Sequence, residues 1–196
     1  MKLFKLIILL VCTTQISACA VAVFAGAAGT TAVVASDRRD VDTQVADHEL
    51  EKTIQNQINH DPSIAKHANV TVVSYKRNIL LVGQAPTDYI RDKVVKMALN
   101  NPDLVDLYNE IRIADKSSTA QKTQDTWLTT KLKARMVADK ELDGHQVKIT
   151  TENGEVFLMG MLTEREKKIA VTIARNMEGV DRVIEIFEPF QKVNEE

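Results

Sequence analysis

Residues 147–166 read VKITTENGEVFLMGMLTERE, and this stretch contains the clearest secondary-structure signals of the chain. Its first three residues alternate between apolar and polar, which is typical of a half-buried strand. Asn153-Gly154 is the strongest short hairpin signal, because both residues tolerate positive φ. A more apolar strand, VFLMG, follows this turn, and Thr163 and Glu166 then form a capping box. The stretch therefore predicts a hairpin that leads into a helix.

The same pattern occurs earlier in the chain. Residues 79–83, ILLVG, match residues 156–160, VFLMG. Ahead of each hairpin lies an amphipathic helix pattern, with apolar residues 3, 7 and 11 positions after Asp47 and after Asp125. We interpret each Asp as a helix N-cap, and Thr87 as the cap of the second helix in the first copy. Two copies of one unit are therefore predicted.

Each copy is expected to run helix–strand–strand–helix–strand, with last strands at residues 105–113 and 180–187. This predicts an α/β (α+β) fold of two tandem domains, each a small mixed sheet with two packed helices. A unit of about 65 residues has a marginal core, so the copies are expected to dock on each other. The expected boundaries are 47–114 for the first domain, 115–124 for a polar linker, 125–188 for the second domain and 189–196 for a C-terminal tail.

The N-terminus is typical of an export signal. Residues 1–18 start with a positive segment, continue with a short apolar run and end in Ile-Ser-Ala before Cys19. The apolar run is shorter than the roughly 20 residues that span a bilayer. The end resembles the bacterial lipobox, which implies a lipidated Cys19, although an ordinary signal peptide with an incidental Cys is the alternative. Residues 19–46 are then the lipidated N-terminus and tether, and Ala20 implies the outer membrane, facing the periplasm.

Composition narrows the function classes. The chain has 196 residues, of which 44% are hydrophobic and 27% charged, and its formal net charge is −2. This balance is globular, and it excludes a global basic field for nucleic acid, so we expect no nucleic-acid partner. Two Cys do not make a disulfide framework. The sequence lacks GxSxG, P-loop and HExxH motifs, so we expect no enzyme, no cofactor and no metal site.

The repeated unit resembles the BON domain, a small bacterial periplasmic module. The resemblance rests on a strand that ends in Gly, a polar cap and helix, and a Val-x-x-Val last strand, here VFLMGMLTERE and then Val180 to Val183. The whole chain resembles the DolP lipoprotein family through the stretches LLVGQ, YNEIR, DTW and TTENGEVFLMG. This resemblance implies an outer-membrane lipoprotein that binds anionic phospholipid, gathers at the division site and supports envelope integrity.

The first helices of the two copies differ in one stripe beside the core face. In the first copy this stripe is polar: Glu49, Thr53, Asn56 and His60. In the second copy it is apolar with one cation: Trp127, Lys131, Ala134 and Ala138. A Trp beside a Lys and small residues suits a lipid headgroup interface. The alternative is that Trp127 packs on the other domain.

The stripe and its basic neighbours form the predicted phospholipid-binding site, and the family resemblance favours the membrane over packing. Its predicted members are Trp127, Thr130, Lys131, Lys133, Ala134, Arg135 and Ala138. The predicted partner is an anionic phospholipid membrane, with outer-membrane assembly or division proteins as further partners. The alternative function is a non-catalytic protein-binding adaptor for an outer-membrane assembly or cell-wall machine.

Overall fold

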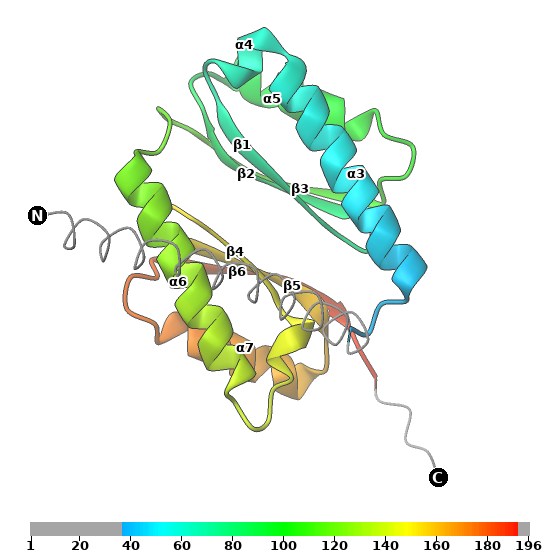
Figure 1. Ribbon diagram of the computed structural model, residues 1–196, viewed down its shortest axis with the longest axis vertical. Helices are drawn as coiled ribbons and strands as arrows, with labels where there is room; N and C mark the ends of the chain where they lie inside the picture. The colour runs from blue at the N-terminus through cyan, green and yellow to red at the C-terminus, as the bar shows by residue number, and fades with distance from the viewer. Residues whose placement is uncertain (1–36, 192–196) are drawn as a thin grey trace, which may run out of the picture. The chain divides into compact units, whose positions relative to one another are not determined.

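The structure is a computed structural model, and it describes residues 37–191 (Figure 1). Two successive domains lie within one structural unit that begins at Arg38. The first contains α3 (Val41–His60), α4 (Pro62–Ala65), β1 (Asn69–Tyr75), β2 (Asn78–Ala85), α5 (Asp88–Leu99) and β3 (Asp106–Ile113). The second contains α6 (Thr119–Val137), the 3-10 helix η1 (Gly144–Gln146), β4 (Lys148–Glu152), β5 (Glu155–Leu162), α7 (Glu164–Arg175) and β6 (Arg182–Pro189). The predicted α/β fold of two tandem units is confirmed.

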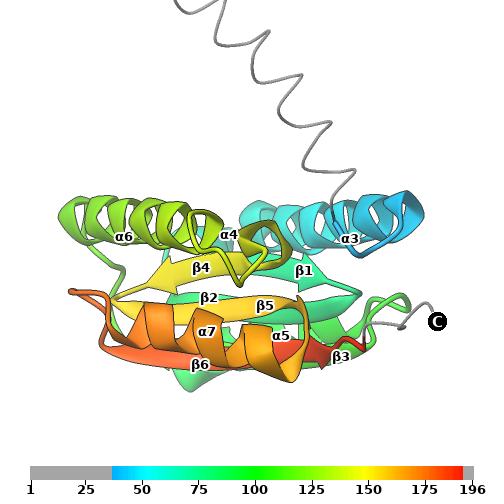
Figure 2. The same cartoon turned by 90° about the horizontal axis from the view of Figure 1, so that it is seen from below.

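Each domain has a three-stranded mixed sheet, in the order β1-β2-β3 or β4-β5-β6. The hairpin pairs β1–β2 and β4–β5 are antiparallel, and the pairs β2–β3 and β5–β6 are parallel. A parallel pair needs a crossover connection, which α5 and α7 supply. Figure 2 shows α3 and α6 flanking β1 and β4, whereas α5 and α7 lie beside β3 and β6.

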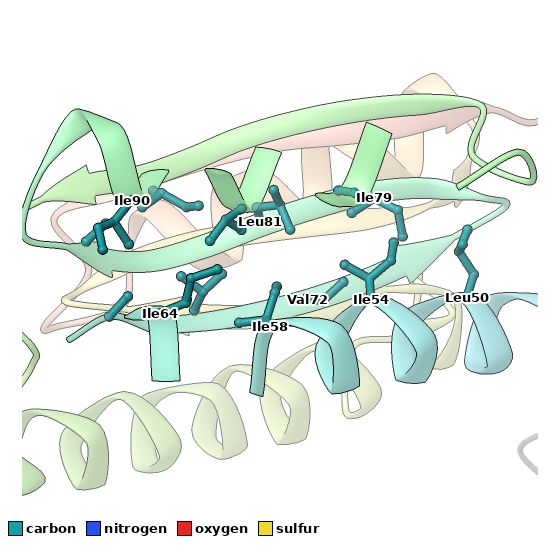
Figure 3. Close-up of a cluster of buried hydrophobic side chains, with 14 residues drawn as sticks. Leu50, Ile54, Ile58, Ile64, Val72, Ile79, Leu81 and Ile90 are labelled. Atoms are coloured by element: carbon teal, nitrogen blue, oxygen red, sulfur yellow. The ribbon is translucent and has the colours of Figure 1, made fainter. Parts of the chain in front are cut away.

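The central strands β2 and β5 are buried on both faces. Ile79 and Leu81 point into the core of the first domain, under α3 (Figure 3). Leu80 lies on the other face of β2, in a cluster with Phe157 and Met159 of β5. Because successive side chains of a strand alternate between faces, β2 contributes both to the core of its own domain and to the cluster between the two sheets. The two sheets therefore pack face to face, and the expected docking of the copies is confirmed.

Polar contacts around this apolar interface also join the domains. The side chain of Asn78 donates to Glu188 (2.9 Å), and at the corresponding place in the other direction Arg112 pairs with Glu155 (2.9 Å). The backbone N–H of Met161 donates to the hydroxyl of Tyr75 (3.0 Å). The interface is thus approximately two-fold symmetric, as expected for two copies of one unit.

The helix starts differ from the prediction. The N-caps are Asp40 for α3 and Ser118 for α6, so both helices begin six residues before the expected Asp. Asp47 and Asp125 lie inside the helices and are buried. The prediction was wrong because a short acceptor near a helix start suits a cap equally well. Residues 41–46, which were assigned to the tether, and residues 119–124, which were assigned to the linker, are therefore helical.

The buried Asp of each domain binds its hairpin turn. Asp47 accepts from the backbone N–H groups of Lys76 (2.7 Å) and Arg77 (2.6 Å). Asp125 accepts in the same way from Asn153 (2.9 Å) and Gly154 (3.0 Å). All four turn residues have positive φ, as the predicted Asn-Gly turn requires. A carboxylate on the first helix thus fixes the hairpin that packs beneath it.

The last strand, β6, runs from Arg182 to Pro189 and so lies two residues beyond the predicted 180–187. Three other local predictions are confirmed. Thr87 caps α5, and Thr163 with Glu166 forms a capping box at α7. Gly83 ends the apolar part of β2 with φ +127°, and a Cβ there would overlap the carbonyl oxygen of Asn69 on β1. The Gly in the repeated strand motif is therefore a requirement of the close approach of two backbones.

Candidate functional site

Helix α6 carries an exposed stripe along its outer side, as predicted. Leu128, Leu132 and Met136 face the core and are buried. Trp127 is 55% exposed, and Lys131, Ala134 and Ala138 are exposed as well. These four residues, 4, 3 and 4 positions apart, share one face of the helix. We refer to them as the α6 stripe.

Trp127 does not pack on the first domain. The cluster between the sheets is built from strand residues, among them Leu80 and Phe157. More than half of the Trp127 surface remains in contact with solvent. The packing alternative is therefore wrong, and a large aromatic side chain is displayed on the surface.

A cation lies against this aromatic ring. The ammonium of Lys131 is 4.4 Å from the centroid of the Trp127 ring. Such a pair is worth about 0.5–1 kcal/mol at an exposed site, and it restrains both side chains. The stripe therefore presents a flat aromatic surface and a positive charge side by side.

Threonines continue the outer surface of α6 with their polar groups already satisfied. The hydroxyls of Thr123, Thr126 and Thr130 each donate to the carbonyl four residues earlier, at 2.8–2.9 Å. A hydroxyl bonded in this way leaves its methyl group toward solvent and needs no new partner in an apolar environment. Thr130, a predicted site residue, belongs to this set.

A groove beside the stripe extends the site to α7. Ala134, Arg135 and Ala138 form one wall, together with Lys131. The other wall comes from the end of α7 and the turn that follows, with Met177 and Glu178. Sequence reasoning missed these two residues, because only the packing of α7 beside α6 brings them near. Glu178 places a negative charge at the edge of an otherwise neutral or basic surface.

Lys133 differs from the other predicted residues. Its ammonium donates to the carbonyls of Gly144 (2.8 Å) and Val147 (2.7 Å), and the side chain is half-buried. At 100° per residue, position 133 lies far around the helix from the stripe. Lys133 therefore ties α6 to the start of β4, whereas Arg135 remains exposed near the stripe.

The matching stripe of α3 has the predicted polar character. Glu49, Thr53, Asn56 and His60 are exposed, and each lies 78 positions before its counterpart on α6. The buried faces of the two helices correspond equally well, because Leu50, Ile54 and Ile58 match the core residues of α6. Only the outer surface distinguishes the two helices.

The base of the expected tether is bound to the domains. Arg38 donates to both carboxylate oxygens of Glu166 (2.9 and 2.6 Å) and lies over the ring of Phe190. The hydrogen bonds from Arg38 lower the pKa of the Glu166 carboxyl to about 2. The next residue, Arg39, pairs with Asp47 (2.7 Å) and lies over Tyr75. Neighbouring residues of the chain thus contact different domains.

The predicted lipidation site lies outside the described residues, as do the signal peptide and residues 19–36. Within residues 37–191, no helix has the length and apolar character needed to cross a membrane. The same range contains no cluster of three or more His, Cys, Asp or Glu side chains arranged to hold a metal ion.

Comparison with known proteins places the chain in a family. The BON domain family model matches residues 46–115 and 124–186. "Outer membrane lipoprotein DolP" of Haemophilus influenzae is 38% identical over 183 residues, which cover 93% of this chain and 94% of the relative. This chain is a DolP-family protein with two BON domains. The "21 kDa hemolysin" of Actinobacillus pleuropneumoniae is 37% identical over 150 residues, covering 76% and 77% of the two chains.

Membership of the DolP family supports an envelope-associated protein at the outer membrane. The structure shows which BON domain has the exposed Trp and Lys side chains on its first helix. The α6 stripe belongs to the second BON domain, and the first BON domain has a polar surface at the same place.

Proposed function

We propose that this DolP-family protein binds anionic phospholipid membranes through the α6 stripe of its second BON domain. The observation that carries the proposal is Trp127, 55% exposed and paired with Lys131 on a helix whose threonine hydroxyls are internally bonded. An indole prefers the headgroup level of a bilayer. A surface of this composition loses little when it enters that layer.

Charge supplies the preference for anionic lipid. Lys131 and Arg135 lie on the outer side of α6, and each basic residue near an anionic surface contributes about 1 kcal/mol. Lipidation at Cys19 would hold the chain at the membrane and raise the effective concentration of the stripe. We further propose that this attachment supports envelope integrity, with enrichment at the division site, on the periplasmic face of the outer membrane.

Binding to protein-free vesicles tests the proposal. Protein prepared without the lipid should sediment with vesicles that contain phosphatidylglycerol, and less with vesicles of phosphatidylethanolamine alone. Trp127→Glu should abolish this binding, because it removes the aromatic group and adds a repelled charge. Asn56→Glu, an acid on the matching stripe of α3, is the control and should bind like the wild type.

Thermal melts of the same samples show whether a variant has lost only the membrane contact or has unfolded. An exposed Trp127 predicts that Trp127→Glu melts within a few degrees of the wild type. If the wild-type protein does not bind anionic vesicles, the proposal is contradicted and the adaptor function is favoured instead. Equal loss of binding in Asn56→Glu would show that the α6 stripe is not the contact.

A further inference from the structure

The outer edge of β1 in the first BON domain is covered by side chains. Gln55 of α3 donates to the carbonyl of Val70 (3.0 Å) and accepts from the N–H of Val72 (3.0 Å). Glu51 accepts from the N–H of Ser74 (3.0 Å), and a lysine of the second BON domain donates to the Ser74 carbonyl (3.1 Å). Backbone groups that would pair with a further strand are therefore occupied, a usual protection of edge strands.

The equivalent edge of the second BON domain is β4. Glu152 and Glu155 flank the two-residue turn and form a hydrogen-bonded pair, so Ile149 and Thr151 point their N–H and C=O groups away from β5. These two residues correspond to Val72 and Ser74 of β1. Within residues 37–191, no side chain or backbone group bonds these outward groups.

The reason for the difference lies in two substitutions between the repeats. Thr129 stands where the first BON domain has Glu51, and its hydroxyl donates to the hydroxyl of Thr151 (2.8 Å). Lys133 stands where the first domain has Gln55. Lys133 donates to the carbonyl of Val147, as Gln55 does to its counterpart, but an ammonium has no acceptor for an N–H.

A groove runs beside the open edge. It has a volume of about 370 Å³ and lies between α6, β4 and the start of β1. Its walls include Thr126, Thr129 and Thr130 of α6 and Thr71 of β1, together with residues 149–152. The hydroxyls of Thr126 and Thr130 are bonded to their own helix. The lining also includes Asp125 and Glu152, and Lys122, whose ammonium donates to the side-chain oxygen of Asn69 (2.7 Å).

We propose that the β4 edge of the second BON domain binds an extended segment of another polypeptide by strand addition. Alternating donors and acceptors at strand spacing are matched by another extended backbone. The threonines that line the groove on α6 and β1 favour a segment with short β-branched side chains, such as Thr and Val. The groove and the α6 stripe have no residue in common, so the inference does not depend on membrane binding.

A synthetic peptide tests the inference on the full chain. The probe is acetyl-Thr-Val-Thr-Val-Thr-Lys-amide, and its control carries N-methyl groups on alternate amides, which removes donors and blocks strand pairing. The unmethylated probe should bind and slow amide hydrogen exchange at Ile149 and Thr151. Absence of binding, equal binding of the methylated probe or unchanged exchange at these amides would overturn the inference.

A variant that introduces the Glu51 carboxylate of the first BON domain at the β4 edge provides a second test. Thr129→Glu places at β4 the carboxylate that Glu51 supplies at β1. This variant should lower the affinity for the peptide by about tenfold, which corresponds to one charge-assisted hydrogen bond. Gln124→Glu adds the same charge elsewhere on α6 and should leave peptide affinity unchanged. Equal weakening by both variants would overturn the inference.

A second variant removes a donor directly and does not depend on how the new Glu folds. Ile149→Pro deletes one outward N–H at an edge position where proline is tolerated. This variant should also lower the affinity for the peptide by about tenfold or more. Melting curves check that the variant is folded. Unchanged affinity in folded Ile149→Pro would overturn the inference.

Discussion

Helices α3 and α6 are built on the same plan and present different surfaces. Each buries an Asp and three apolar residues at the same spacing, and each covers the hairpin of its domain. Their outward positions 49 and 127 hold Glu and Trp, and positions 53 and 131 hold Thr and Lys. The residues that the core needs are the same in both repeats, whereas the positions without packing constraints differ.

The hairpin turns should give the largest difference between the domains. The turn bound by Asp47 places two non-glycine residues, Lys76 and Arg77, at positive φ, whereas Asp125 holds Asn153-Gly154. We expect Asp47→Ala to lower the free energy of unfolding by about 4 kcal/mol, because buried donors lose a charged acceptor. Asp125→Ala should cost about 2 kcal/mol, since its turn is favoured locally. Urea unfolding measures both, and equal costs would contradict the comparison.

Acid should act on the second BON domain through Glu166. Its pKa is lowered to about 2 from 4.5 by Arg38. The lowered pKa means that its stabilisation is complete above about pH 4.5 and is lost as the pH falls toward 2. The loss should amount to about 2–3 kcal/mol. Glu166→Gln keeps a capping residue at this position, and its stability should vary less between pH 4.5 and 2 than that of the wild type.

Moving the Trp–Lys pair from α6 to α3 tests whether these two residues are sufficient for binding. Glu49→Trp combined with Thr53→Lys places the Trp–Lys pair on α3. In the Trp127→Glu background this double variant should recover part of the binding to anionic vesicles, by about 1–2 kcal/mol. Vesicle sedimentation measures the recovery, and Glu49→Ala with Thr53→Ala is the control. Complete failure in a folded variant would mean that the orientation of α6 matters as well as its residues.

The smallest effect is expected from a single charge. Lys131→Gln removes one positive charge and the contact with the Trp127 ring, so vesicle affinity should fall about fivefold, corresponding to about 1 kcal/mol. Lys133→Gln should change affinity less, because that ammonium binds carbonyls of its own domain. Titration at rising salt should weaken the wild type more than Lys131→Gln.

Local patterns predicted most of the fold and the exposed stripe. Apolar spacing, the Asn153-Gly154 turn and the capping box depend on residues close together in sequence, and the structure has them as predicted. The roles of Asp47 and Lys133 could not be predicted in this way. Asp47 binds a turn 29 and 30 residues away, and Lys133 binds carbonyls 11 and 14 residues away. Such partners are determined by tertiary packing.

The neighbouring arginines Arg38 and Arg39 have a mechanical consequence. Arg38 bonds to Glu166 in the second BON domain, and Arg39 bonds to Asp47 in the first. A pull exerted on the chain from its N-terminal side therefore reaches both domains within one residue. Such a load meets two largely buried ion pairs before it reaches the first turn of α3. With the proposed lipid anchor at Cys19, this attachment would transmit tension to the joined pair of domains as a whole.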